Sequence, residues 1–253
     1  MKTLPTVIGA FTVFFVVTAS GFAQTPKGEV TVFQLGNQAI RIPAPEGFEE
    51  AASKFEVIKD QFTRTEAAEN DMLAVHLPHA DCERLRAGGF GPFHSNTKVS
   101  VRRAIREIDY SAERFTSLVA TFRKNGTQLL DVNSPIMKSA IRRLDNTLSE
   151  LSKQETEVDL AQPVNLGEFD TRPNVYSVML LLNFKTKSGD DEVRVLIAGG
   201  LSYVRVGQRL IYVYTFRKFT SAADVEVLRD FTKKWIGQIL AANVAGGSST
   251  TRP

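Results

Sequence analysis

The reactive side chains of this sequence gather in one short stretch, HLPHADCERLRAGGFGPFH, at residues 76–94. This stretch holds all three histidines and the one cysteine of the chain: His76, His79, Cys82 and His94. Imidazole and thiolate groups bind zinc, and ligand pairs in structural zinc sites are often about two to four residues apart. The four side chains therefore offer a ligand set for zinc, provided that the fold brings them together.

The local pattern argues against such a site. His76 lies in the strand-like run DMLAVHL, and Pro78 disfavours a regular helix across His76 and His79. A thiol catalyst needs His79 to accept the proton of Cys82, and residues three apart meet most readily on a helix. Asp81 is expected to cap the short turn CERLR instead. We therefore predict no catalytic residue and no cofactor, and keep a zinc-dependent or thiol hydrolase centred on this stretch as the alternative.

Other catalytic motifs are missing or incomplete. Ser95 and Lys98 have the spacing of the penicillin-recognising enzymes, but the SDN and KTG elements of those enzymes are absent from the sequence. The sequence also lacks a G-x-S-x-G elbow, an H-E-x-x-H motif and a P-loop. The commonest signatures of hydrolases and nucleotide-binding proteins are therefore absent, which favours a protein without enzymatic activity.

Two further groups of residues are candidates for a ligand or partner surface. The basic run VRRAIR supplies Arg102, Arg103 and Arg106, but the formal net charge of +3 is small and both signs are interspersed, which argues against nucleic acid. In the run RLIYVYTF, Tyr212 and Tyr214 share one face of an expected strand, and Tyr203 belongs to the preceding strand. These tyrosines are expected in the core, unless one sheet face is left open for a ligand.

The start of the chain has the pattern of a secretory signal peptide. Lys2 precedes an apolar run from Leu4 to Val17, and small residues follow up to Ala23. The run is shorter than the roughly 20 apolar residues of a lasting membrane span. We therefore expect residues 1–23 to be removed, leaving a soluble periplasmic or secreted protein with no transmembrane segment.

Residues 24–243 are predicted to form a single α+β domain, and residues 244–253 a disordered tail. Alternating runs around Gly36 predict an early hairpin, and three long alternating runs within residues 175–216 predict antiparallel strands. A final amphipathic helix carries Trp235. Shorter strands are expected at DMLAVHL and at residues 98–105.

Helical periodicity dominates the middle of the chain. One helix is expected after the capping-box pair Ser53 and Glu56, and a second over residues 111–124, ended by Asn125 and Gly126. A third begins at Ser134, with a proline in its first turn. The predicted fold class is an antiparallel sheet covered by helices, with a helical-hairpin insertion in the middle.

The segment RIPAPEGFEE, together with the late hairpin and the tryptophan-bearing helix, resembles the PsbP-like fold and its exported bacterial relatives. The resemblance implies an accessory or partner-binding protein without a shared catalytic residue. We therefore expect an exported, non-enzymatic binding protein of the bacterial envelope, whose partner is a protein or a small-molecule ligand.

Overall fold

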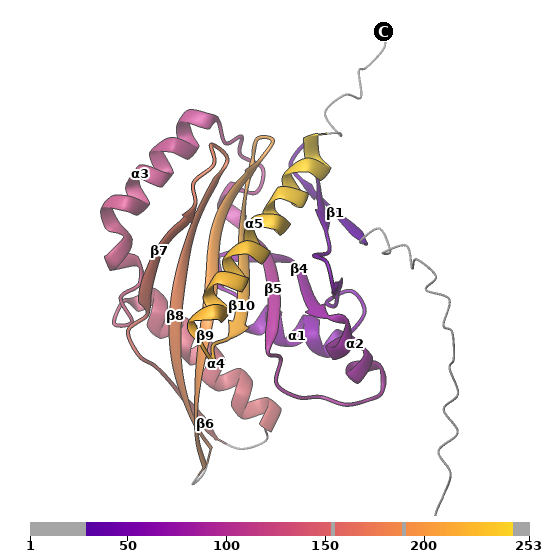
Figure 1. Cartoon of the computed structure of the whole chain (residues 1–253), viewed down its shortest axis with the longest axis vertical. Helices are drawn as coiled ribbons and strands as arrows, with labels where there is room; N and C mark the ends of the chain where they lie inside the picture. The colour runs from indigo at the N-terminus through magenta and orange to yellow at the C-terminus, as the bar shows by residue number, and fades with distance from the viewer. Residues whose placement is uncertain (1–28, 153–154, 189–190, 245–253) are drawn as a thin grey trace, which may run out of the picture.

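One large antiparallel sheet forms the centre of the molecule, as the computed structural model in Figure 1 shows. The structure describes residues 29–152, 155–188 and 191–244. The expected signal peptide and the tail beyond Val244 lie outside the described residues. Val244 itself ends the last helix.

Within the described residues, eight strands make up this sheet, in the order β3-β4-β5-β10-β9-β8-β6, with β7 also paired to β8. The strands are β3 (Phe48–Glu50), β4 (Asn70–Pro78), β5 (Ser95–Arg102), β6 (Thr156–Leu160), β7 (Val164–Asp170), β8 (Val175–Ser188), β9 (Asp191–Val206) and β10 (Arg209–Lys218). β8, β9 and β10 are the longest strands of this sheet. Two further strands, β1 (Val30–Leu35) and β2 (Gln38–Pro43), form a separate hairpin.

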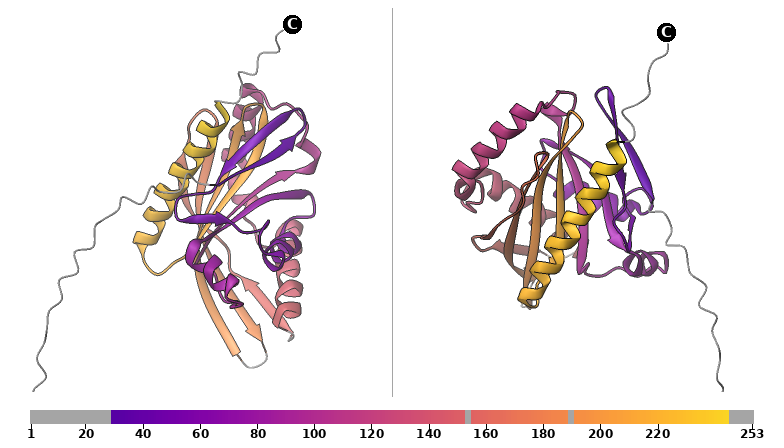
Figure 2. Two further views of the ribbon diagram at one scale, coloured as in Figure 1. Left: turned by 90° about the vertical axis from the view of Figure 1, so that its right-hand side faces the viewer. Right: turned by 45° about the horizontal axis from the view of Figure 1, so that its top comes forward.

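Helices cover both faces of the sheet. They are α1 (Glu56–Thr65), α2 (His79–Arg86), α3 (Ala112–Leu129), α4 (Pro135–Ser152) and α5 (Ala222–Val244). Figure 2 shows α3 and α5 on opposite sides of the strands, and in Figure 1 α4 lies behind the sheet while α5 lies in front. The α+β class and the helical middle segment are therefore confirmed.

The core under α5 joins the early hairpin to the late strands. Trp235 and Ile236 pack with Ile211 and Val213 of β10, and with apolar side chains of β1 and β2. The indole Nε1 of Trp235 donates a hydrogen bond to the carbonyl oxygen of Pro43 at 2.8 Å. Each fully buried large apolar side chain stabilises the fold by about 1.5–3 kcal/mol. The burial of these side chains therefore holds α5 against this face of the sheet.

The first expected hairpin is present, and a buried arginine side chain contacts its turn. Gly36 has φ = +57°, a left-handed conformation that glycine adopts without strain. The side chain of Arg209, only 2% exposed, donates from Nε to the carbonyl oxygen of Leu35 at 2.7 Å and from Nη1 to the carboxylate of Asp109. The guanidinium group thereby ties the β1–β2 turn to β10.

Several local predictions were wrong. No side chain caps α1, because Ser53 hydrogen-bonds to the carboxylate of Glu50 instead. α2 begins at His79 directly after Pro78, so Asp81 is not its cap but lies in its first turn and pairs with Arg84 at 2.7 Å. Pro78 separates β4, which holds His76, from the helix that begins at His79, because its fixed φ suits the residue before a first helical turn.

Other differences concern element boundaries. α3 continues through Asn125 and Gly126 to Leu129 rather than stopping there. β5 begins at Ser95 and ends at Arg102, and a 3₁₀ turn follows over Arg103–Ile105. β6 and β7 were not predicted at all.

Candidate functional site

His76 lies in the interior, on the face of the sheet that α5 covers. Its side chain is fully buried, with Nδ1 3.0 Å from the hydroxyl oxygen of Thr97. The imidazole meets the ring of Trp235 edge-on, with 5.3 Å between ring centroids. Burial lowers the pKa of His76 to about 3, so the side chain is neutral at physiological pH.

Cys82 belongs to a different part of the core. It is buried on α2 against Ala51, Ile58 and Leu77. Burial, with a further effect from the negative charge of Glu49, raises the pKa of the Cys82 thiol to about 12. The thiol therefore stays protonated, whereas a thiol nucleophile requires a lowered pKa.

The other two histidines lie at the surface. His79 is 60% exposed, with Nδ1 3.6 Å from a carboxylate oxygen of Glu49. His94 is exposed just before β5. Among the residues that the structure describes, no group of three His, Cys, Asp or Glu side chains is placed to hold a metal ion. The zinc hypothesis gains no support from these positions.

Two of the three basic residues meet one carboxylate. Arg103 Nε lies 2.7 Å and Arg106 Nη1 lies 3.0 Å from the oxygens of Asp71. Hydrogen bonds from Arg103 and Arg106 hold the pKa of Asp71 below its ordinary value, although partial burial opposes them. Arg102 is exposed at the end of β5. Much of this positive charge is thus balanced within the protein.

The predicted tyrosine face is the face that carries α3 and α4. The ring of Tyr203 lies 4.1 Å from that of Phe122 on α3 and meets Tyr212 edge-on at 5.2 Å. Tyr214 is stacked on Phe216 at 6.4 Å, further along β10. α3 therefore covers one end of this aromatic face, whereas the other end borders a pocket.

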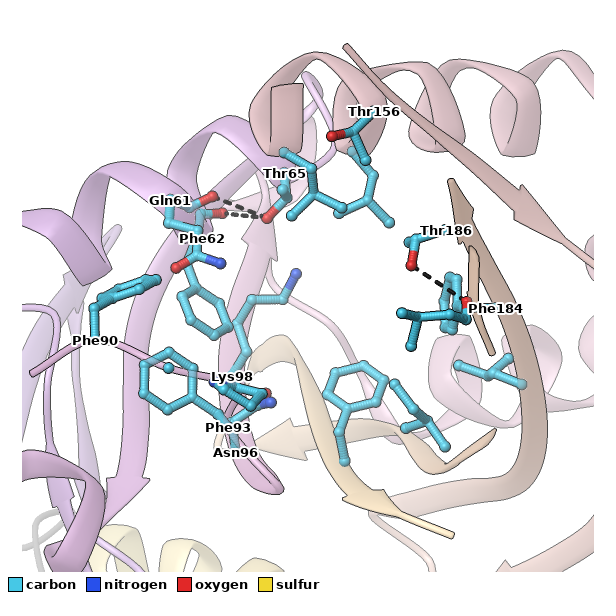
Figure 3. Close-up of a pocket in the computed structure, with 18 residues that line it drawn as sticks. Gln61, Phe62, Thr65, Phe90, Phe93, Asn96, Lys98, Thr156, Phe184 and Thr186 are labelled. Atoms are coloured by element: carbon cyan, nitrogen blue, oxygen red, sulfur yellow. Dashed lines mark hydrogen bonds between the residues drawn. The ribbon is translucent and has the colours of Figure 1, made fainter. Parts of the chain in front are cut away.

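This pocket, with a volume of about 810 Å³, lies between the sheet, α1, α4 and the loop that contains Phe90 and Phe93 (Figure 3). Apolar side chains dominate its lining. The phenylalanines are Phe62, Phe90, Phe93, Phe184 and Phe216, and the aliphatic residues are Leu144, Leu148, Leu182, Val193 and Ile197.

The strand register shows which residues form the floor of the pocket. Phe216 is paired with Asn96 and Gly199, and Leu182 with Ile197, so all of these residues share one face of the sheet. A Cβ atom on Gly199 would lie 3.4 Å from the Phe216 ring and 3.5 Å from the Leu182 side chain. The missing side chain at Gly199 therefore lets Phe216 extend across the floor.

Lys98 is the single charged residue in the described lining, and it is already paired. Its Nζ lies 2.8 Å from a carboxylate oxygen of Glu66 and 4.8 Å from the centroid of the Tyr214 ring. Ser100 Oγ donates to the same carboxylate oxygen at 2.6 Å, and Asn70 Nδ2 donates to the other oxygen at 2.9 Å. Burial alone would raise the pKa of Glu66, but the charge of Lys98 and these hydrogen bonds hold it below its ordinary value. The pair therefore stays ionised.

Few features of the sequence indicated this pocket. Lys98 attracted notice only for its spacing from Ser95, and Phe90 and Phe93 only as part of a glycine-rich loop. The alternation that places Tyr214 and Phe216 on one face was the nearest signal. It indicated an aromatic surface but not the helices beside it.

Comparison with known proteins gives no family. No protein-family model and no curated protein matches the sequence. Among solved structures, a mutant of the protein Mog1 matches with 13% identity and a TM-score of 0.32, covering 86% of this chain and 94% of that chain. The Saccharomyces cerevisiae Ran-binding protein Mog1p matches with 12% identity and a TM-score of 0.31, covering 85% of this chain and 94% of that chain.

The PsbP-like resemblance is wrong as a family assignment, because these two solved structures are Mog1 proteins rather than PsbP proteins. The TM-scores are too low for either match to support a function. No helix in the described ranges has the length and apolar character that crossing a bilayer requires.

Proposed function

We propose that this protein is a non-enzymatic binding protein that takes an apolar small molecule into the pocket between the sheet, α1 and α4. The pocket itself carries this proposal. Its volume of about 810 Å³ lies in the range of small-molecule sites, about 300–1,000 Å³. Its walls come from segments far apart in the sequence, as is usual for sites formed by a fold.

The exposure of the lining supports an occupant. Val193 is 54% exposed and Phe90 is 52% exposed, although both are apolar and both border the pocket. Contiguous apolar surface is costly in water and commonly marks a binding site. An apolar ligand that covers such surface gains roughly 25 cal/mol for each Å² removed from water.

The chemistry of the reactive groups supports binding rather than catalysis. His76 is held neutral beneath α5, and Cys82 is held protonated in a separate cluster. Neither residue lines the pocket, whose one charged side chain, Lys98, is paired with Glu66. Within the part of the chain that the structure describes, neither His76 nor Cys82 is placed to act as a base or nucleophile beside the ligand space.

We place this binding function in the periplasm or in the secreted fraction, as an accessory protein of the bacterial envelope. The support is the pattern of residues 1–23, in which a lysine, an apolar run and small residues follow one another. A carrier for an apolar molecule suits an aqueous compartment that such molecules must cross.

Binding can be tested with N-phenyl-1-naphthylamine, an uncharged probe whose fluorescence rises in apolar surroundings. Ile197→Arg puts a charged side chain on the floor of the pocket and is expected to weaken binding about tenfold or more. Leu196→Arg is the matched control, because Leu196 is the adjacent residue of β9, is 38% exposed and points to the opposite face.

Melting temperatures of both variants equal to that of the wild type would show that the fold is kept. A wild-type protein that does not bind the probe at micromolar concentration contradicts the proposal. Equal binding by wild type and Ile197→Arg contradicts it as well.

A further inference from the structure

We infer that the ligand is an uncharged molecule with an apolar body and one hydrogen-bonding head group, of the alcohol or carboxamide class, which lies against Gln61, Asn96 and Lys98. This inference rests on the proposed function and specifies the chemistry of the molecule that the pocket takes.

The position of the head group follows from two unsatisfied amides. Gln61 Oε1 and Asn96 Oδ1 are buried and have no hydrogen-bond partner within the described residues. Both side chains line the pocket, one from α1 and one from β5. Buried amides nearly always have partners in native proteins, so a pair of unsatisfied amides on one wall indicates a missing polar group. Each of the two atoms is an amide oxygen, so the group that satisfies it is a hydrogen-bond donor.

Lys98 belongs to the same wall. Lys98 and Asn96 are two residues apart on β5, so their side chains emerge on the same face. Figure 3 shows Gln61, Asn96 and Lys98 on one side of the pocket, across from Phe184 and Thr186. The Lys98 ammonium group has three N–H donors, and one carboxylate, that of Glu66, is its ion-pair partner. A donor is therefore left for an acceptor on the ligand.

Among the described residues on the opposite side, the Thr186 hydroxyl is already engaged. The Thr186 hydroxyl donates to the carbonyl oxygen of Val193 at 3.3 Å. Beside it lie Phe184, Leu182 and Ile197, which are apolar. The apolar body of the ligand is therefore directed toward β8 and β9, and its head group toward α1 and β5.

The charge of the ligand follows from the Glu66–Lys98 pair. The two charges cancel, and Glu66 has its own donors in Ser100 and Asn70. A carboxylate on the ligand would bring an unbalanced negative charge next to Glu66 in an apolar site, and an ammonium group would meet Lys98. Burying an uncompensated charge is far more costly than burying a hydroxyl group that finds partners. The site therefore selects an uncharged head group.

A matched series of naphthalene compounds tests the inference by calorimetry at neutral pH. The compounds are naphthalene, 2-naphthol, 2-naphthamide and 2-naphthoate, which share one apolar body. We expect 2-naphthol and 2-naphthamide to bind about fivefold more tightly than naphthalene, because they hydrogen-bond to the polar wall. We expect 2-naphthoate to bind about tenfold more weakly than 2-naphthol, because its charge is unbalanced.

The charge argument predicts that one variant loses the preference for 2-naphthol over 2-naphthoate. Glu66→Gln removes the negative charge that balances Lys98, so 2-naphthoate should gain about tenfold relative to 2-naphthol. Glu69→Gln is the control, since Glu69 is exposed and the substitution makes the same change in net charge. This control should leave the ratio of the two affinities as it is in the wild type.

The amides supply a second test that does not depend on the folding of Glu66→Gln. Gln61→Leu and Asn96→Leu keep the approximate size of the side chains, and each should reduce the advantage of 2-naphthol over naphthalene. If no compound of the series binds, the proposed function fails and this inference fails with it. If the compounds bind but 2-naphthoate binds most tightly to the wild type, or the head group makes no difference, this inference alone is overturned.

Discussion

Cys82 and His76 lie in two separate clusters, and in each the surroundings decide what the side chain can do. Their spacing in the sequence suggested zinc or a thiol catalyst, but spacing says nothing about burial. His76 faces Thr97 and Trp235 under α5, whereas Cys82 packs beneath α1. Desolvation disfavours the charged form of each group, so its acid–base reactivity is suppressed.

The reactivity of Cys82 provides a prediction at this scale. Because burial raises the pKa of its thiol to about 12, alkylation by iodoacetamide at neutral pH should be about a hundredfold slower than in the unfolded chain. Mass spectrometry of the protein with and without guanidinium chloride measures both rates, and the denatured sample serves as the control. Rapid alkylation of the native protein would show that Cys82 is an accessible thiolate.

At the scale of elements, a buried side chain of β10 holds the turn of the β1–β2 hairpin. Arg209→Met removes the donors to the Leu35 carbonyl and to Asp109, and leaves the carbonyl without its partner. We expect the free energy of unfolding to fall by about 3 kcal/mol, measured by urea denaturation.

The control for this change is Arg194→Met. Arg194 is 70% exposed and pairs with Glu192 at 3.3 Å, so its loss should cost less than about 0.5 kcal/mol. Equal losses in the two variants would mean that the buried guanidinium group of Arg209 is not what secures the hairpin.

The elements also show how far the sequence determines the fold. β8, β9, β10 and α5 were predicted because strand-favouring or helical patterns extend over many of their residues. β7 was missed because most of its residues are exposed, which leaves no apolar alternation to detect. α3 runs through Asn125 and Gly126 because a helix stop is a weak local preference that the rest of the fold can override.

The pocket was not predicted, for a different physical reason. Its walls are α1 and α4, whose facing residues Phe62 and Leu148 lie far apart in the sequence. Periodicity shows that each helix has an apolar side, but it does not show that the two sides leave a space between them. The same limit applies to Glu66 and Lys98, whose pairing requires α1 and β5 to be in place.

Across the whole molecule, the two faces of the sheet are covered unequally. α5 seals one face with Trp235, Ile236 and Ile239. On the other face, α3 packs over Tyr203 and Tyr212, and α4 lies near β6, so the apolar surface between the two helices remains accessible. This asymmetry explains why the ligand space lies beside the aromatic part of β10 rather than beneath the final helix.

Export of the whole chain is a prediction that the fold itself does not test. When the full sequence is expressed in a Gram-negative bacterium, the mature protein in the periplasmic fraction should begin at Gln24, because Ala23 and the small residues before it suit a signal peptidase. N-terminal sequencing and the intact mass identify the cut. Ala23→Phe, which replaces the small residue at the cut by a bulky one, should slow processing and leave the longer form attached to the membrane. A wild-type protein that keeps Met1 and stays in the cytoplasmic fraction would contradict export, but not the pocket or its expected preference for an uncharged ligand, because both depend on residues of the folded domain.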